Sequence, residues 1–409
     1  MDLIVRNAVL ANRLGDGPLD IAVESGRIAA IDKALSGEAQ EYDAGGRLVC
    51  AGLIETHIHL DKSRIIGRCP PPEGRRVNPV TAVKPLKPAM TVEDVYQRAE
   101  VTLRECLVNG TTRMRTQVEA DPGIGLRGFE AIAALARDYR WAIDIEICIF
   151  PQEGLTNYPG TEELLVEALK AGAPVLGAAP RYDSDPSTQL ERIFALAREF
   201  DVPLDLHLDV GDSTEHMDIY KTLELTERYQ RGGRVTVGHM AKLSLMPPSD
   251  AAAMARRLAD AGIAVTVLPA TDLYLMGRHQ DHAVLRGVAD ANLLAAHGVT
   301  CSLSSNNILN PATPYGDCSL IRIANLHANL LQIAVPAQLR ELFLMLSENS
   351  ARLLGLEDYG LAVGKPADIV VVDAETPEQA VAEIRPPLAV WKRGRQTVVR
   401  RPPELLYPA

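Results

Sequence analysis

Cysteine is sparse in this sequence and follows no recognisable spacing. The 409 residues include six cysteines, which are scattered and form no C-x-x-C pair. Disulfide frameworks and structural zinc cages both depend on several suitably spaced cysteines. The sequence therefore argues against both.

Long apolar runs and an excess of basic residues are also missing. No apolar stretch reaches the roughly 18 residues that a membrane-spanning helix needs. The first residues, Met1-Asp2-Leu3-Ile4, include an acid and begin no apolar run of signal-peptide length. The net charge of -11 and the pI near 5.4 argue against nucleic acid and anionic membranes as partners. We expect a cytoplasmic protein.

The composition that remains is ordinary for a globular protein, with 47% hydrophobic and 23% charged residues. Short strands are predicted near both ends of the chain. Residues 21–24 and 27–31 flank Ser25-Gly26, a two-residue hairpin signal, and residues 369–373 and 389–399 again predict strands. Because each end is too short for a core of its own, 1–50 and 356–409 are predicted to combine into one small β-sandwich.

Between residues 51 and 355, short apolar runs alternate with longer helical patterns. Strands buried on both faces have such continuous apolar runs. Eight strand-and-helix units over roughly 300 residues have the length of a (β/α)8 barrel in the α/β class. The first strand is predicted near Leu53, and the others at 111–116, 143–150, 175–179, 203–207, 235–239, 264–268 and 300–303.

His57 and His59 stand two residues apart where the first barrel strand is expected to end. In an extended strand, residues i and i+2 point to the same face. The two imidazoles can therefore converge on one metal ion. An isolated His-x-His is equally compatible with a polar pair near a surface, so the rest of the chain has to decide.

Other polar residues fall at predicted strand ends, where barrels of this kind carry their chemistry. His207 ends the fifth strand, His239 ends the sixth, Gln152 follows the third and Asn306 follows the eighth. Four imidazoles at one barrel mouth suit Zn²⁺, Fe²⁺, Mn²⁺ or Ni²⁺, with a position open for water. The remaining histidines are assigned solvent-facing or packing roles: His216, His279, His282, His297 and His327.

The chain resembles the amidohydrolase superfamily, and within it the cytosine deaminase branch. The resemblance rests on motifs spread over nearly the whole chain: His57-Ile58-His59-Leu60-Asp61-Lys62, Phe150-Pro151-Gln152-Glu153-Gly154, His207, His239, Leu275-Met276-Gly277-Arg278, Asn310-Pro311, Pro314-Tyr315-Gly316 and Asp358-Tyr359-Gly360. It implies a distorted barrel with a β-sandwich built from both termini, and one divalent metal ion held by His57, His59 and His207. It also implies that His239 lies near the metal or polarises the substrate, and that Gln152 reads a substrate amide.

Two positions depart from the pattern of this branch. Val210 stands where its deaminases carry a glutamate that shuttles protons to the ring nitrogen. Asn306 stands where they carry an aspartate that binds the metal and takes the proton of the attacking water. An amide oxygen can ligate a metal weakly, but it cannot act as a general base near neutral pH. We therefore do not expect a plain cytosine deaminase.

Three explanations for the missing base stay open. Another carboxylate can substitute, with Asp209, Asp61 and Asp317 as candidates; strand alternation predicts Asp209 on the same face as His207. Alternatively His239 is the base, with the metal lowering the pKa of water toward about 7, or the site is metal-poor and acts differently on a related ring. The candidate catalytic residues are His239, Asp209 and Asn306, and the candidate metal ligands are His57, His59, His207, His239 and Asn306.

Basic residues near the predicted mouth bear on the substrate. Lys84 and Lys87 lie in a proline-rich loop, Arg115 is predicted to end the second strand, and Arg181 follows the fourth. Arginine grips carboxylates with two hydrogen bonds, so an anionic heterocycle fits better than bare cytosine, unless these cations pair with nearby acids such as Glu119, Asp183 or Asp185. The candidate substrate-binding residues are Gln152, Lys84, Arg115, Arg181, Tyr274 and Arg278.

The sequence thus predicts a metal-dependent amidohydrolase that cleaves a C–N bond of a small nitrogen heterocycle, cyclic amide or ureide. Desulfuration or amine removal on a thiohydantoin- or triazine-like ring is one alternative, and an inactive heterocycle-binding relative is another. We expect one divalent metal ion, zinc before iron, manganese or nickel. We also expect a homo-oligomer whose partner is a small heterocyclic molecule.

Overall fold

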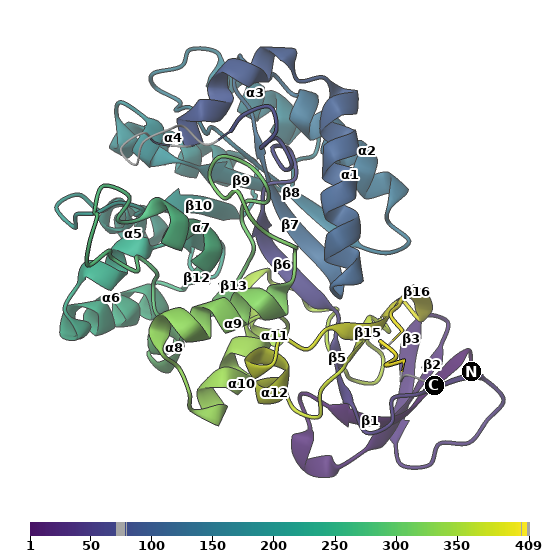
Figure 1. Cartoon of the computed structure of the whole chain (residues 1–409). Coiled ribbons are helices and arrows are strands. Elements are labelled where there is room, and N and C mark those ends of the chain that lie inside the picture. Colours follow the sequence, from purple (N-terminus) through teal and green to yellow (C-terminus); the bar gives the residue numbers. More distant parts are fainter. Residues whose placement is uncertain (71–77, 79, 402, 407–409) are drawn as a thin grey trace.

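The computed structural model describes residues 1–70, 78, 80–401 and 403–406. Within them the chain forms two sheets, a parallel barrel from the middle of the sequence and a mixed sheet from its two ends (Figure 1). Among the described helices, none has both the length and the apolar character that crossing a bilayer requires.

Eight parallel strands form the barrel, each paired with the next one in chain order. They are β6 (Leu53–Ile58), β7 (Thr111–Glu119), β8 (Asp144–Phe150), β9 (Val175–Ala178), β10 (Leu204–Leu208), β11 (Val235–His239), β12 (Ile263–Val267) and β13 (Cys301–Leu303). Most of their residues are buried, because helices cover the outside and side chains fill the inside. The predicted (β/α)8 barrel is confirmed.

The barrel closes between β6 and β13 with little backbone pairing. Ile58 forms one isolated bridge with Asn306. The hydroxyl of Thr56 lies 2.8 Å from the hydroxyls of Ser302 and Ser304. Side-chain hydrogen bonds thus replace much of the backbone pairing between β6 and β13. This junction also places Asn306 beside the end of β6 that carries His57.

Helices cover the barrel on its outside (Figure 1). Those that fill the helical intervals predicted between the barrel strands are α1 (Val92–Val108), α2 (Arg127–Asp138), α3 (Thr161–Lys170), α4 (Pro186–Glu199), α5 (Ile219–Arg228), α6 (Pro248–Asp260) and α8 (Ala291–Ala296). Five further helices were not predicted from the sequence: α7 (Pro269–Leu275), α9 (Leu320–Leu331), α10 (Pro336–Leu344), α11 (Glu348–Leu353) and α12 (Pro377–Ala382). Of these, α7 follows directly on β12 and contributes residues to the barrel mouth.

Both ends of the chain build the second sheet, which confirms the predicted composite β-structure. Its strands are β1 (Leu3–Leu10), β2 (Leu19–Glu24), β3 (Arg27–Asp32), β4 (Gln40–Asp43), β5 (Leu48–Ala51), β14 (Ile369–Val372), β15 (Pro387–Lys392) and β16 (Arg395–Val399). The order is β16-β15-β14-β5-β1-β2-β3, with β4 beside β1. Apolar side chains such as Leu10, Ile21 and Trp391 give this sheet its own core. The division of the chain at residues 50 and 355 stays a prediction.

Lys392 ties this sheet to the barrel. Its side chain is 1% exposed, and Nζ donates to Asp144 at 2.7 Å, to Asp368 at 2.6 Å and to the carbonyl oxygen of Thr112 at 3.0 Å. Asp144 and Thr112 lie at the starts of β8 and β7. The lysine therefore fixes β15 to the end of the barrel opposite the histidines.

Candidate metal centre and active site

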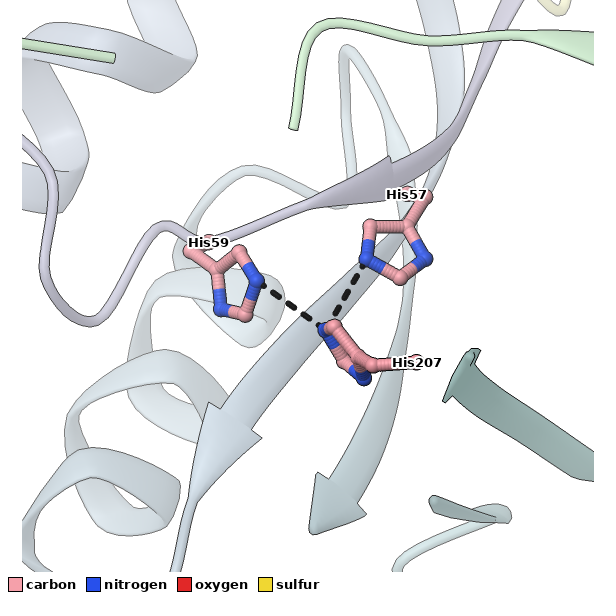
Figure 2. Close-up of side chains that lie close together, drawn as sticks. All are labelled: His57, His59 and His207. Atoms are coloured by element: carbon pink, nitrogen blue, oxygen red, sulfur yellow. Dashed lines mark hydrogen bonds between the residues drawn. The ribbon is translucent and has the colours of Figure 1, made fainter. Parts of the chain in front are cut away.

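Three imidazoles converge at the carboxyl end of the barrel strands. His57 lies in β6, His59 follows it, and His207 lies in β10. Nε2 of His207 is 3.1 Å from Nε2 of His57 and 3.2 Å from Nε2 of His59, and Figure 2 shows the three rings turned toward one another. Nitrogens held tetrahedrally by one ion at about 2.0–2.1 Å lie about 3.3 Å apart. The spacing therefore fits a shared metal ion.

The protonation of these rings also suits metal binding. Burial lowers the pKa of His57, and it lowers the pKa values of His59 and His207 well below the usual range. The rings are therefore neutral near pH 7 and keep a lone pair for an ion. Nδ1 of His57 lies 3.3 Å from a carboxylate oxygen of Asp205, the kind of partner that orients a metal-ligating histidine.

Arg115 supports that carboxylate instead of meeting a substrate. It lies within β7, not at its end, and donates to Asp205 at 3.1 Å and to Glu146 at 2.6 Å. Although burial alone would raise the pKa of the Asp205 carboxyl, His57 and Arg115 hold that pKa below its usual value. The expectation that Arg115 binds substrate is therefore replaced by a supporting role beneath the histidines.

The backbone of Asn306 bonds to those of His57 and His59. Its backbone N–H donates to the carbonyl of His57 at 3.0 Å, and its own carbonyl accepts from the N–H of His59 at 2.9 Å. Its side chain is buried, and neither amide atom has a hydrogen-bond partner in the described part of the chain. A buried amide without a partner is costly. The orphaned Oδ1 therefore fits a role as a further ligand of the same ion.

His239 lies beside the three-imidazole cluster. Its ring centroid lies 5.7 Å from that of His207 and 6.0 Å from that of His57. Nδ1 of His239 is 2.5 Å from a carboxylate oxygen of Asp272, which is fully buried in α7. Burial raises the pKa of Asp272 although the neighbouring imidazole opposes this. Sequence reasoning missed Asp272, because no predicted element placed it near β11.

The carboxylates considered as replacement bases are engaged elsewhere. Asp209 follows β10 with a left-handed φ of 55°, and its oxygens accept the N–H groups of Asp218 and Ile219 at the start of α5. This turn ends the strand alternation that predicted Asp209 on the face of His207, although both residues line one cavity. Asp61 accepts backbone N–H groups from Lys62 and Glu119, and Asp317 pairs with Arg322 at 2.8 Å.

A cavity above the histidines contains some of the predicted substrate-binding residues. Gln152 and Arg181 line it together with His59, His207 and His239. Lys62, which the sequence analysis did not select, lines it too, and its Nζ donates to Glu119 at 2.6 Å and to Oε1 of Gln152 at 2.9 Å. Since Lys62 occupies the amide oxygen, Gln152 keeps its NH₂ group for a ligand. The signal for Lys62 was its place directly after the His-x-His run.

Other predicted contacts lie away from this cavity. Lys87 is buried among Glu119, Asp121 and Glu153 at 2.7–2.9 Å, so its ammonium fills an acidic cluster that otherwise has the composition of a metal site. Lys84 is half-exposed and lies 3.8 Å from Glu153. These two lysines therefore form ion pairs, which was the alternative expected for them.

Tyr274 and Arg278 are also displaced from the expected position. Tyr274 lines a second cavity, together with Tyr315, while Thr271 and Leu275 of the same helix line the cavity with the histidines. The guanidinium of Arg278 stacks on the Tyr274 ring at 4.8 Å. Tyr274 and Arg278 therefore lie on a different side of α7 from the three imidazoles.

Comparison with known proteins establishes the family. The model of the amidohydrolase family matches residues 78–398. Pterin deaminase of Rhizobium rhizogenes is 27% identical over 382 residues, covering 92% of this chain and 87% of that protein. N-isopropylammelide isopropyl amidohydrolase of Pseudomonas sp. is 28% identical over 414 residues, covering 96% of each. The structure of 5-methylcytosine deaminase from Klebsiella pneumoniae with phosphonocytosine has a TM-score of 0.93 at 27% identity, covering 99% of this chain and 100% of that one. The chain therefore belongs to the amidohydrolase family, in its cytosine deaminase-like branch.

Proposed function

We propose that the protein is a metal-dependent hydrolase that cleaves a C–N bond of a small nitrogen heterocycle, cyclic amide or ureide. The observation that carries this proposal is the convergence of three imidazole Nε2 atoms, two of them buried and that of His207 partly buried, beside the orphaned amide of Asn306. The relatives support the substrate class, since their names specify a pterin, an ammelide and a methylcytosine. A C–N hydrolase in this family is not restricted to cytosine.

One divalent ion is expected, held by His57, His59 and His207 with Asn306 as an additional ligand. Zinc is the first expectation for a site rich in imidazole, before iron, manganese and nickel. When bound, such an ion lowers the pKa of a water molecule toward about 7 and polarises the reacting group of a substrate.

His239 is the proposed proton carrier. Asp272 occupies Nδ1 of His239, which leaves Nε2 for the cavity that the ring lines. Val210 supplies no carboxyl group where related deaminases have an acid, so a single imidazole has to accept the proton of the attacking water and deliver it to the leaving group. Ring deamination, removal of an alkylamino group and displacement of sulfide all fit this sequence of transfers. The ammelide-hydrolysing relative favours the second of these.

The metal content of the purified protein tests the proposal. We expect about one Zn, Fe, Mn or Ni per chain by elemental analysis, lost in His57→Ala. His297→Ala is the matched control, because this ring bonds the carbonyl of Leu293 in α8, away from the mouth. Cyclic amidines, hydantoins and thiohydantoins are then screened for release of ammonia, amine or sulfide. The proposal would be contradicted if the purified protein contained no metal and took none up on reconstitution.

The homo-oligomer and the cytoplasmic location stay predictions. Light scattering of the purified protein checks the first, with a mass well above the 44.3 kDa of one chain as the expected result. Cell fractionation checks the second.

A further inference from the structure

The cavity above the histidines has an unbalanced set of charges. Among its described lining residues, Lys62 and Arg181 are cationic and Asp209 is the one acid. Both oxygens of Asp209 already accept backbone N–H groups, from Asp218 at 2.9 Å and from Ile219 at 3.1 Å. The carboxylate is therefore satisfied by the start of α5, and it offers little to a ligand.

Arg181 is the cation without a counter-charge. It lies in the short 3-10 turn Pro180–Tyr182 after β9 and is exposed at the rim of the cavity. One guanidinium nitrogen, Nη1, donates to the carbonyl oxygen of Val210. Within the described part of the chain, no carboxylate lies within ion-pair distance of this guanidinium, so its other N–H groups are free for a ligand.

The acids that are nearest to Arg181 in the sequence serve other partners. Asp183 accepts the backbone N–H groups of Leu155 and Thr156 at 2.6 and 3.0 Å. Asp185 caps α4 by accepting the N–H of Thr188 at 3.0 Å. Both carboxylates are fixed by these bonds, so neither neutralises Arg181.

Val210 adds to the lack of a counter-charge at Arg181. The backbone carbonyl of Val210 accepts a hydrogen bond from Arg181. Related deaminases have an acid at this position, and such a side chain would lie close to the guanidinium. Valine leaves the charge of the guanidinium uncompensated. Lys87 shows the opposite arrangement, in which three carboxylates at 2.7–2.9 Å surround one ammonium. Arg181 can therefore pair with the carboxylate of a ligand, whereas Lys87 is already neutralised by the protein.

Two other polar groups of the cavity are donors as well. Nζ of Lys62 and the NH₂ group of Gln152 belong to the same lining, and Lys62 holds the amide oxygen of Gln152 at 2.9 Å. A ligand that fits must therefore present acceptors to these groups. Because Glu119 balances the charge of Lys62 at 2.6 Å, the uncompensated charge is at Arg181.

We propose that the substrate is an anionic heterocycle, whose ring bears a carboxylate that Arg181 grips at the rim while Gln152 and Lys62 donate to ring acceptors. Arginine suits this task because its planar donors match a carboxylate. The inference rests on the proposed function for the identity of the site, and it adds the charge of the substrate.

Matched ligand pairs test the inference on the metal-loaded full-length protein. Calorimetric titration compares uracil with 6-carboxyuracil, and hydantoin with hydantoin-5-acetate. The carboxylated member of at least one pair should bind about tenfold more tightly or better, as a hydrogen bond to a charged group predicts. Arg181→Gln should abolish that preference, Arg181→Glu should reverse it, and Arg181→Lys should keep part of it. Arg192→Gln, on the exposed face of α4 where Arg192 pairs with Glu162, is the matched control.

The outcomes separate this inference from the proposed function. Equal affinity within both pairs, failure of both carboxylated probes to bind, or a preference that survives Arg181→Glu overturns the anionic substrate, even if neutral rings are hydrolysed. A carboxylate preference that depends on Arg181 supports it, even if no ring is hydrolysed and the proposed reaction fails.

Discussion

At the scale of single residues, the proposed proton transfer depends on the pair formed by His239 and Asp272. A carboxylate on Nδ1 fixes the tautomer of an imidazole and stabilises its protonated form. The 2.5 Å contact and the complete burial of Asp272 give this carboxylate that position. In the proposed mechanism, Asp272 acting through His239 takes the place of the acid that is absent at Asn306.

Asp272→Asn should lower kcat by about 10²-fold or more, because an asparagine cannot stabilise the imidazolium. KM and the metal content should stay unchanged, since the three converging imidazoles are not touched. Steady-state kinetics with the substrate found by the screen, together with elemental analysis, checks this. Asp250→Asn, an exposed position in α6, is the control. An unchanged kcat would show that His239 needs no carboxylate.

Asn306→Asp should create the acid that is typical of cytosine deaminases. We expect ammonia release from cytosine or isocytosine to become measurable where the original protein shows none, because an aspartate can both ligate the metal and accept a proton. Asn329→Asp, exposed in α9, serves as the control. If no ammonia appears, Val210 or the cavity walls exclude these rings instead.

His327 gives a prediction about stability. It is fully buried in α9, neither ring nitrogen has a partner in the described part of the chain, and burial lowers its pKa to about 4. The unfolded chain binds a proton below its usual pKa of about 6.5, so this group costs stability as the pH falls from about 6.5 toward 4. Compared with His327→Leu, the original protein should lose about 2 kcal/mol more between pH 7 and pH 5. Urea unfolding at both pH values measures the difference, and equal losses would contradict it.

The sequence identifies the histidines of the site because two rules converge on them. Strand alternation pairs His57 with His59, and the barrel rule brings His207 and His239 to the same mouth. Asp272 could not be predicted, since its effect depends on where a helix of 7 residues crosses the mouth. Arg115 was misplaced for a similar reason, because a strand boundary shifted by a few residues moves a side chain from the mouth to the interior.

At the scale of secondary-structure elements, Lys392 of β15 connects the terminal sheet to β7 and β8. Lys392→Met removes the buried cation that Asp144 and Asp368 share, although Asp144 keeps its pair with Arg393 at 2.8 Å. We expect a loss of about 3–5 kcal/mol in the free energy of unfolding. Arg385→Met should cost less than about 1 kcal/mol, because its pair with Glu383 is exposed. Denaturant unfolding of both variants checks the contrast, and similar losses would remove the special role of Lys392.

The barrel strands were predictable because they are continuous apolar runs, and the helices between them because they fill regular intervals. The elements that were missed follow no such interval. Four helices, α9 to α12, come after the last barrel strand, and β4 is a polar strand of 4 residues with the burial of an edge. Such segments show no clear hydrophobic periodicity, and the eight strand-and-helix units of a barrel do not include them.

At the scale of the whole molecule, the two sheets share one short connection. Gly52 separates β5 from β6, its N–H donates to the carbonyl of Asp368, and its own carbonyl accepts the Tyr359 hydroxyl. A Cβ atom at this glycine would lie 1.9 Å from the Thr112 hydroxyl oxygen. The start of the histidine-bearing strand is therefore fixed by residues from the far end of the chain.

A chain that ends at residue 355 should therefore fail to form the metal centre, although every barrel strand is present. It lacks β14, so β5 keeps an unpaired edge that favours aggregation. We expect most of this protein in the insoluble fraction and no bound metal in the remainder. A soluble, monodisperse product with one metal per chain would show that the barrel needs no terminal sheet.

The joint sheet also imposes an order on synthesis. As the ribosome releases the chain, β5 emerges long before β14, and β6 emerges long before the β13 seam. Before Gly52, β5 therefore keeps one open edge until β14 (Ile369–Val372) is made, and after Gly52, β6 keeps one until β13 (Cys301–Leu303) is made. If His57 and His59 hold a metal ion as proposed, its capture would follow the closure of the β6–β13 seam, and a chain terminated before that point would expose unpaired strands to chaperones and proteases.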